Sequence, residues 1–188
     1  MSRVIMNTEQ IQEACQRIGK ELCDIFKKEE KIPVIVGVMK GSLNFMFDLM
    51  KFITVPIYTD YVQVASYQGT KNTGKTRLLK DLSFNCENRT VVIVEDIVDT
   101  GYTLQYLKSL VERHNPKRII LVSLLNKQHA RKVQIDLDFA GLEYTGDDFL
   151  IGYGLDFFEL ERNVPFVYAI EDDEIEKLNQ FLDRDMEG

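Results

Sequence analysis

A run of β-branched residues that stops on acidic residues constrains this chain more than any other segment. Residues 91–104 read VVIVEDIVDTGYTL. The first four have no polar face, so they suit a strand buried on both sides of a parallel sheet, with Glu95 and Asp96 at its carboxyl end. Ligands of open α/β sheets bind at that end. The segment therefore predicts both an α/β fold and the place of a site.

A short polar turn, residues 99–103, follows and leads into leucines at helical spacing. Such a turn offers backbone N–H groups to a phosphate, with the helix dipole behind them. The carboxylates of Glu95 and Asp96 can hold Mg²⁺ or accept hydrogen bonds from ribose hydroxyls. The ordered set indicates a phosphorylated sugar with a metal. The alternative is that Asp99 or Thr103 caps the helix while the two acids are solvated.

Helix and strand patterns alternate along the chain and predict a mostly parallel, twisted sheet flanked by helices. Asn7 and Gln10 form a variant of the capping box before the first helix. Helices are expected at residues 8–28 and 42–52, after residue 104 and at about 172–184. Strands are expected at 34–38, 58–66, 91–94 and 119–125, with a short segment at 78–82 and shorter strands near Phe139, Phe149 and Val167.

The length and the cysteines limit the class of protein. A chain of 188 residues fits one domain with a single core, residues 1–188. No apolar stretch approaches the roughly 20 residues that span a bilayer, and the start lacks a signal-peptide core. Three cysteines without paired CxxC spacing are expected to be reduced and buried. These features predict a cytoplasmic protein that does not enter a membrane.

The charge distribution speaks against nucleic acid as a partner. Residues 171–188 hold eight acidic residues against two basic ones, so most of the formal net charge of −7 lies in this tail. The remainder is nearly neutral and shows no clustered basic face. In the tail, Ile175, Leu178 and Phe181 recur at helical spacing, which predicts a terminal helix docked by one stripe with its acids in solvent.

A second phosphate motif offers a rival interpretation. Residues 69–76 read GTKNTGKT and match the phosphate loop of nucleotide triphosphatases, as in a small nucleotide kinase. That motif needs an apolar strand running into its first glycine and a long helix from its lysine. Here polar residues precede Gly69, and only six residues separate Thr76 from Ser83. A mobile lid over about residues 66–77 fits the sequence better.

Five segments, in family order, resemble the hypoxanthine-guanine branch of the type I phosphoribosyltransferases. They are VGVMKGSLNFMFDLM at 36–50, SYQGTKNTGKTRLLKDL at 66–82, VVIVEDIVDTGYTL at 91–104, LLNK at 124–127 and FLIGYGLDFFELERNVPF at 149–166. The resemblance implies the type I phosphoribosyltransferase fold, with a small hood and a lid. It also implies a Mg²⁺-dependent glycosyltransferase of purine salvage. Such an enzyme moves 5-phosphoribosyl from phosphoribosyl pyrophosphate to N9 of hypoxanthine or guanine, giving IMP or GMP and pyrophosphate.

The resemblance assigns roles to the residues around the ribose phosphate. Glu95 and Asp96 would engage the ribose hydroxyls, directly or through Mg²⁺. Asp99 would be the general base or the hydrogen-bond partner at N7 of the purine. The residues that would wrap the 5′-phosphate are Thr100, Gly101, Tyr102 and Thr103.

Pyrophosphate contacts follow from the same resemblance. Lys40 and Gly41 match the pyrophosphate-binding loop, in which the peptide before the lysine, here Met39 to Lys40, is often cis. Arg162 matches a second cation on pyrophosphate. Asp156 resembles the acid that holds a second Mg²⁺ there.

The base would be read by residues of two further segments. Lys127 matches the lysine at the exocyclic O6, and an ammonium donates to a 6-oxo group but suits the 6-amino group of adenine poorly. Phe149 would stack on the purine, and Ile151 would offer its backbone to the base edge. Read singly, both look like core strand residues. Ser66 and Tyr67 match the pair that closes over the reacting centre.

Three questions stay open in the sequence. A regulator that keeps the same pocket as a nucleotide sensor and binds RNA is the alternative function, and it would need an exposed basic face. The resemblance implies a homodimer or homotetramer without indicating the interface. Acceptance of xanthine and the preference between hypoxanthine and guanine are undetermined.

Overall fold

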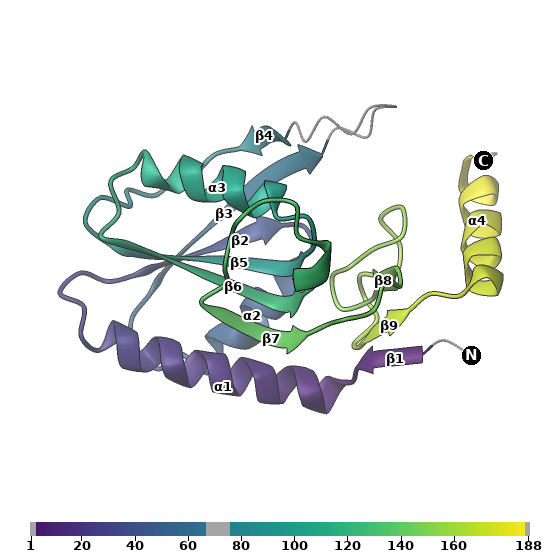
Figure 1. The fold of residues 1–188 in the computed structure, drawn as a ribbon, viewed down its shortest axis with the longest axis horizontal. Helices are drawn as coiled ribbons and strands as arrows, with labels where there is room; N and C mark the ends of the chain where they lie inside the picture. Colours follow the sequence, from purple (N-terminus) through teal and green to yellow (C-terminus); the bar gives the residue numbers. More distant parts are fainter. Residues whose placement is uncertain (1–2, 67–75, 187–188) are drawn as a thin grey trace.

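A six-stranded sheet forms the centre of the molecule (Figure 1). The structure is a computed structural model that describes residues 3–66 and 76–186. The strand order is β4-β3-β2-β5-β6-β7, and every pair is parallel except β3 with β4. The strands are β2 (Val34–Met39), β3 (Tyr58–Ser66), β4 (Thr76–Lys80), β5 (Thr90–Val98), β6 (Arg118–Asn126) and β7 (Phe139–Glu143). The predicted, mostly parallel α/β fold is confirmed.

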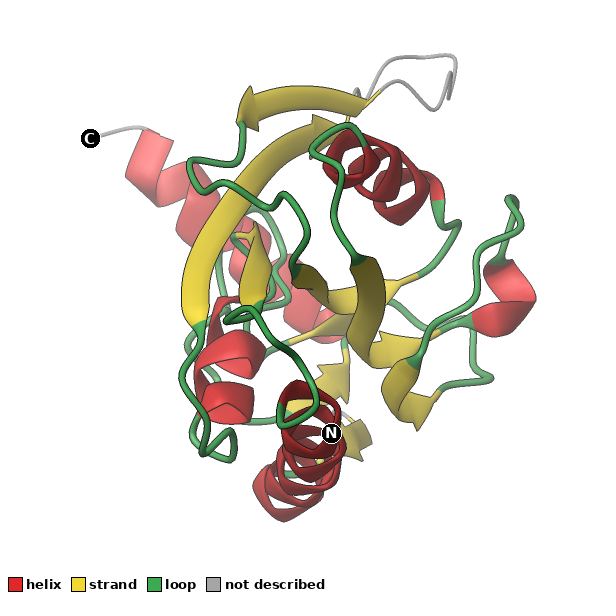
Figure 2. Ribbon diagram, turned by 90° about the vertical axis from the view of Figure 1, so that its left-hand side faces the viewer, coloured by secondary structure: helices red, strands yellow, loops and turns green. Residues whose placement is uncertain are grey.

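Helices cover both faces of this sheet (Figures 1 and 2). Helices α1 (Thr8–Phe26) and α2 (Leu43–Met50) pack on one face, and α3 (Tyr102–Glu112) packs on the other. On β5, Val92 and Val94 belong to the first core, whereas Val91 and Ile93 belong to the second. Because successive strand side chains point to opposite faces, burial on both sides explains why this run has no polar face.

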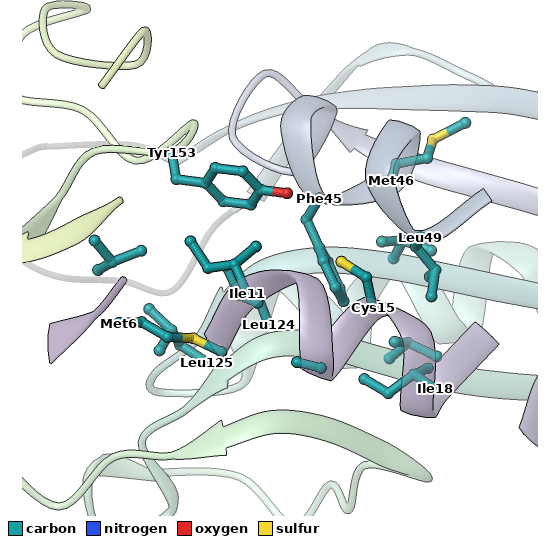
Figure 3. Close-up of a cluster of buried hydrophobic side chains, with 14 of the residues drawn as sticks. Met6, Ile11, Cys15, Ile18, Phe45, Met46, Leu49, Leu124, Leu125 and Tyr153 are labelled. Carbon is teal, nitrogen blue, oxygen red and sulfur yellow. The ribbon is translucent and has the colours of Figure 1, made fainter. Parts of the chain in front are cut away.

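The core beneath α1 and α2 also anchors the segment that follows β7. Figure 3 shows Ile11 and Cys15 of α1 beside Phe45 of α2, with the ring of Tyr153 at the edge of the cluster. The Tyr153 hydroxyl donates to Oδ2 of Asp48 at 2.5 Å. This bond attaches the turn around residue 153 to α2.

A small antiparallel sheet forms the hood that the resemblance implies. Its order is β1 (Arg3–Met6), β9 (Val167–Ala169) and β8 (Leu150–Ile151). Strand β1 was not predicted, because four residues with an exposed start give no pattern of their own. It forms only by pairing with β9, far along the chain.

The acidic tail forms helix α4 (Asp172–Met186), as predicted, but its apolar stripe is not buried as a whole. Ile175 and Leu178 are half-buried, whereas Phe181 is 61% exposed. The prediction of a docked stripe is therefore wrong at Phe181. Helix α4 begins shortly after β9, a strand of the hood. It lies on the side of the hood that faces away from the central sheet (Figure 1).

Several local predictions are confirmed. The capping box is present: Gln10 N donates to Asn7 Oδ1 at 2.8 Å, and Asn7 N donates to Gln10 Oε1 at 2.9 Å. The three cysteines are free and buried. Residues 76–80 form strand β4, where the phosphate loop of a nucleotide kinase would need a helix, which argues against that alternative. Among the described residues, no helix has both the length and the apolar character to cross a membrane.

Candidate active site

The acidic pair lies where β5 extends past its pairing with β2. Strand β5 pairs with β2 only through Val94, whereas its pairing with β6 continues to Val98. The predicted strand end at Val94 is therefore wrong, because β6 still supplies hydrogen-bond partners. Glu95 is 6% exposed and Asp96 is half-buried. This burial contradicts the alternative that the two acids are simply solvated.

Gly41 brings the predicted pyrophosphate loop against this acidic pair. A Cβ on Gly41 would lie 1.7 Å from Oδ2 of Asp96, and a Cβ on Gly154 would lie 2.1 Å from the backbone oxygen of Gly41. Only glycine permits approaches this close. Three segments that the sequence keeps far apart therefore meet at one point. The Met39–Lys40 peptide is cis, as the resemblance implies.

Burial disfavours the charged forms of both acids. It raises the pKa of Glu95 well above its ordinary value, with the neighbouring Asp96 carboxylate adding to the effect. Burial also raises the pKa of Asp96 to about 6, although the N–H of Ile97 donates to its carboxylate at 2.8 Å. A divalent cation beside this pair would stabilise the ionised forms, so the pair fits a metal-binding role.

Asp156, the third predicted metal ligand, forms an ion pair with Arg162. Its Oδ1 is 2.8 Å from Nη2 of Arg162. Within residues 3–66 and 76–186, no three His, Cys, Asp or Glu side chains gather closely enough to hold a metal by themselves. Mg²⁺ commonly takes one or two carboxylates together with water and substrate phosphates. The residues present therefore fit Mg²⁺ that arrives with a phosphorylated substrate and do not form a closed protein cage.

The predicted phosphate turn surrounds a small hollow at the start of α3. A cavity of about 110 Å³ is lined by Glu95, Asp99, Thr100, Gly101 and Thr103, among others. Gly101 has a φ of +86°, in the left-handed region that favours glycine. Asp99 is exposed, so its carboxylate is accessible to a ligand. The helix N-terminus and the turn thus have an arrangement that can bind an anion, and binding of the 5′-phosphate there stays a prediction.

Arg131, which was not among the predicted site residues, supports this turn through its backbone. Its Nη1 donates to the backbone oxygen of Asp99 at 2.9 Å, and its Nη2 donates to Oδ1 of Asn126. Asn126 in turn donates to Glu143 of β7. A Cβ on Gly101 would lie 2.8 Å from Cδ of Arg131. The turn is therefore connected to the edge strand through a polar chain.

The residues predicted to contact the base lie at the end of β6 and in or beside strand β8 of the hood. Lys127 is 8% exposed, and its Nζ donates to the backbone oxygen of Asp148 at 2.7 Å. Phe149 is 58% exposed, which contradicts its reading as a core residue, and it meets Phe157 edge-on with ring centroids 6.3 Å apart. Ile151, in β8, is fully buried, so its side chain is not available to a ligand, and a contact from its backbone to the base stays a prediction.

The predicted pyrophosphate cations share an acidic partner that was not among the predicted site residues, Glu159. Glu159 Oε2 lies 2.8 Å from Nζ of Lys40 and 3.3 Å from Nη2 of Arg162. Arg162 also donates from Nη1 to the backbone oxygen of Gly154 at 2.6 Å. The two cations therefore lie near each other and beside the point where Gly154 meets Gly41.

The predicted lid lies mostly outside the described residues. Ser66 ends β3 and is paired with Thr76 of β4, but its side chain is not described. Tyr67 lies outside the described residues, and with it most of the segment at 66–77. Their role in closing over the reacting centre stays a prediction.

Comparisons with known proteins agree with this geometry. The sequence model of the phosphoribosyl transferase domain family matches residues 6–157. The hypoxanthine-guanine phosphoribosyltransferase of Bacillus subtilis is 39% identical over 172 residues, which cover 91% of this chain and 94% of that protein. A crystal structure of a hypoxanthine phosphoribosyltransferase from Staphylococcus aureus matches with a TM-score of 0.85 at 37% identity, covering 91% of this chain and 92% of that one.

Some relatives are much longer. A bifunctional TilS/HprT protein of Listeria monocytogenes is 37% identical over 168 residues, or 89% of this chain, but the match spans only 26% of that protein's length. The similarity thus concerns one part of the longer protein. Together with the family match and the site geometry, these similarities show that the chain belongs to the phosphoribosyl transferase domain family, within its hypoxanthine-guanine phosphoribosyltransferase branch.

Proposed function

We propose that this chain is a purine salvage enzyme that transfers 5-phosphoribosyl from phosphoribosyl pyrophosphate to N9 of hypoxanthine or guanine. The products are IMP or GMP and pyrophosphate. One observation carries the proposal: Gly41 lies between Asp96 and Gly154. This contact joins the acidic pair, the pyrophosphate loop and the segment that carries Arg162. The names of the relatives support the same activity.

The reaction breaks the bond from ribose C1 to pyrophosphate and forms a bond from C1 to N9. Ribose gains oxocarbenium character as pyrophosphate gains negative charge, so cations beside the leaving group stabilise the transition state. We assign this role to Lys40 and Arg162. When bound, Mg²⁺ would neutralise part of the negative charge on the phosphates, and Glu95, Asp96 and Asp156 are the residues that would hold it.

The base loses a proton as its new bond forms, and we assign the acceptance of that proton at N7 to Asp99. The hydrogen bond from Arg131 to the backbone oxygen of Asp99 fixes the start of the turn that carries this carboxylate. Lys127 would donate to O6, since its ammonium already donates to a carbonyl oxygen, that of Asp148. Phe149 offers an exposed ring for stacking on the purine.

The 5′-phosphate belongs in the hollow at the start of α3. The backbone N–H groups of residues 100–103 are the donors that we assign to it, with the positive end of the α3 dipole behind them. Anchoring the phosphate there would set the distance from ribose C1 to the base and to the pyrophosphate cations. Positioning of this kind contributes a large part of the rate enhancement in transfer reactions.

We also infer that the chain forms a homodimer or homotetramer. An apolar groove of about 430 Å³ lies between α2 and β3, lined by Met39, Leu43, Phe47, Met50 and Tyr61, among others. Phe47 is 55% exposed there, which is unusual for a large apolar side chain beside other exposed apolar residues. Light scattering after size exclusion should give more than one chain per particle, and Phe47→Glu should shift it toward one. A cytoplasmic location is supported by the free cysteines.

The test of the proposed function is nucleotide formation from phosphoribosyl pyrophosphate and Mg²⁺ with hypoxanthine, guanine, xanthine and adenine in parallel. We expect turnover of hypoxanthine and guanine and no turnover of adenine. The reaction with xanthine shows whether the enzyme also accepts that base. Asp99→Asn should lose about a hundredfold in kcat, the usual scale of general acid–base catalysis. A folded wild-type protein that converts none of the four bases would contradict the proposal.

A further inference from the structure

Glu159 contacts both of the cations that we assign to pyrophosphate. Its Oε2 accepts a hydrogen bond from Lys40 Nζ at 2.8 Å and lies 3.3 Å from Arg162 Nη2. The same Nη2 lies 2.8 Å from Oδ1 of Asp156. Two cations and two carboxylates therefore form one ion cluster, and Glu159 is the member that touches both cations.

The backbone fixes the direction of this glutamate. Phe157 and Leu160 exchange backbone hydrogen bonds at 3.2 and 3.0 Å, which closes a tight turn. Inside it, Phe158 and Glu159 have φ values of +48° and +70°, a conformation that residues other than glycine rarely adopt. The N–H of Glu159 donates to Oδ2 of Asp156 at 2.8 Å. The turn thus presents the Glu159 side chain toward Lys40, a residue 119 positions away in the sequence.

Another anion can replace Glu159 in its ion pair with Lys40, because this pair is exposed to solvent. The side chain of Glu159 is 61% exposed and that of Lys40 is 53% exposed. Ion pairs as exposed as this one are weak, so an anion of higher charge can displace the carboxylate. Pyrophosphate carries more negative charge than one carboxylate and needs the same donors. Binding of pyrophosphate to Lys40 and Arg162 therefore competes with Glu159.

We propose that Glu159 is a built-in competitor of pyrophosphate that lowers the affinity of the Lys40–Arg162 pair for it. The inference rests on the proposed function and extends it, because nothing in the resemblance gives Glu159 a role. Glu159 acts through the two cations, so it is a positioning residue. As pyrophosphate departs, the carboxylate of Glu159 forms its ion pairs with Lys40 and Arg162 again. This competition favours release of pyrophosphate, so that release does not limit turnover.

The direct test is the affinity of the whole chain for inorganic pyrophosphate in the presence of Mg²⁺, measured by isothermal titration calorimetry. Glu159→Gln should bind pyrophosphate about threefold to fivefold more tightly than wild type, the fold-change of a lost exposed ion pair. Glu161→Gln is the matched control, since it removes the same charge two positions away, where the carboxylate accepts from the Tyr168 hydroxyl at 3.0 Å. The control should bind as wild type does.

Steady-state kinetics supply a second readout. Glu159→Gln should lower the KM for phosphoribosyl pyrophosphate by a similar factor without raising kcat, a split that general loss of structure would not produce. In a Lys40→Gln background, the gain in pyrophosphate affinity from Glu159→Gln should shrink, because one of its two partners is gone. An equal gain in both backgrounds would show a long-range charge effect and would overturn the inference.

Other outcomes separate the inference from the proposed function. If Glu159→Gln bound pyrophosphate more weakly than wild type, Glu159 would hold Lys40 and Arg162 in position for pyrophosphate. If Glu159→Gln and Glu161→Gln gained the same affinity for pyrophosphate, the effect would come from net charge alone. Either result overturns the competitor role while leaving an active wild-type enzyme. Absence of nucleotide formation by wild type with every base would instead overturn the proposed function, and the pyrophosphate titration would still report on Glu159.

Discussion

The α-carbon of Gly41 lies directly against the carboxylate of Asp96, so that a Cβ at position 41 would be 1.7 Å from Oδ2. Gly41→Ala must therefore displace Asp96 or the loop itself. We expect kcat/KM to fall about a hundredfold, because a shift of about 1 Å in a reacting group has that effect, with a loss of about 1 to 3 kcal/mol in unfolding free energy from overpacking. Kinetics and urea unfolding of the same preparation test both parts. Unchanged activity would mean that the contact has no part in catalysis.

Arg131 offers a test of the turn that carries Asp99. Arg131→Met removes the donors to the Asp99 backbone oxygen and to Asn126. We expect kcat/KM to fall about tenfold to a hundredfold as the turn loses its position. Lys132→Met is the matched control: its side chain is exposed, and the bond to the Thr100 oxygen comes from its backbone N–H. Equal losses in the two variants would contradict the supporting role of Arg131.

The buried carboxylate of Asp60 should make stability depend on pH. It accepts from the N–H groups of Tyr61, Ser83 and Phe84 and from Lys80 Nζ. Burial alone would raise the pKa of Asp60, but these four donors hold it below its ordinary value. A group with a lowered folded pKa stabilises the fold above its unfolded pKa of about 3.9, and this contribution is lost as pH falls through the folded pKa.

Asp60→Asn should therefore lower the unfolding free energy by about 2 to 4 kcal/mol at neutral pH, and the difference from wild type should narrow below about pH 4. Urea unfolding at about pH 7 and about pH 3 measures this difference. Asp81→Asn, at an exposed neighbour, serves as the control. A difference that stays constant over the whole range would show that charge on Asp60 is not what stabilises the fold.

Lys127 should determine the use of 6-oxopurines. Lys127→Ala removes an ammonium that is 8% exposed and close to the hood. We expect kcat/KM for hypoxanthine to fall about tenfold to a hundredfold, the range for loss of a charged hydrogen bond, without any gain with adenine. Lys177→Ala, in α4, controls for loss of an exposed lysine. Hypoxanthine turnover equal to wild type would remove Lys127 from base recognition.

Patterns of neighbouring residues in the sequence predicted the helices, strands and loops that carry the candidate site. The strand, acids, turn and helix at 91–104 follow one another in the chain, so their chemistry is visible without a fold. Glu159 and Arg131 were missed because their partners are distant: Glu159 contacts Lys40 across 119 positions, and Arg131 contacts the Asp99 backbone across 32. The only signal for Glu159 was an acid three residues before the predicted cation Arg162.

Burial was harder to predict than secondary structure. Helical spacing predicted α4 correctly, but the pattern does not say whether a partner covers Phe181. Phe149 is a second case. An apolar residue next to a strand is expected in the core, yet Phe149 is 58% exposed. Strand β1 depends wholly on its pairing with β9, so four residues alone could not indicate it.

Transfer of 5-phosphoribosyl to the base is measured most directly by the stoichiometry of one reaction. Wild type would be incubated with phosphoribosyl pyrophosphate, Mg²⁺ and hypoxanthine, and IMP and pyrophosphate would be quantified together, with Asp99→Asn alongside. We expect one IMP for each pyrophosphate, dependence of both products on hypoxanthine, and a rate about a hundredfold lower in the variant. If pyrophosphate were released at the same rate without hypoxanthine, and no IMP formed with it, the reaction would be hydrolysis and the chain would not be a phosphoribosyltransferase.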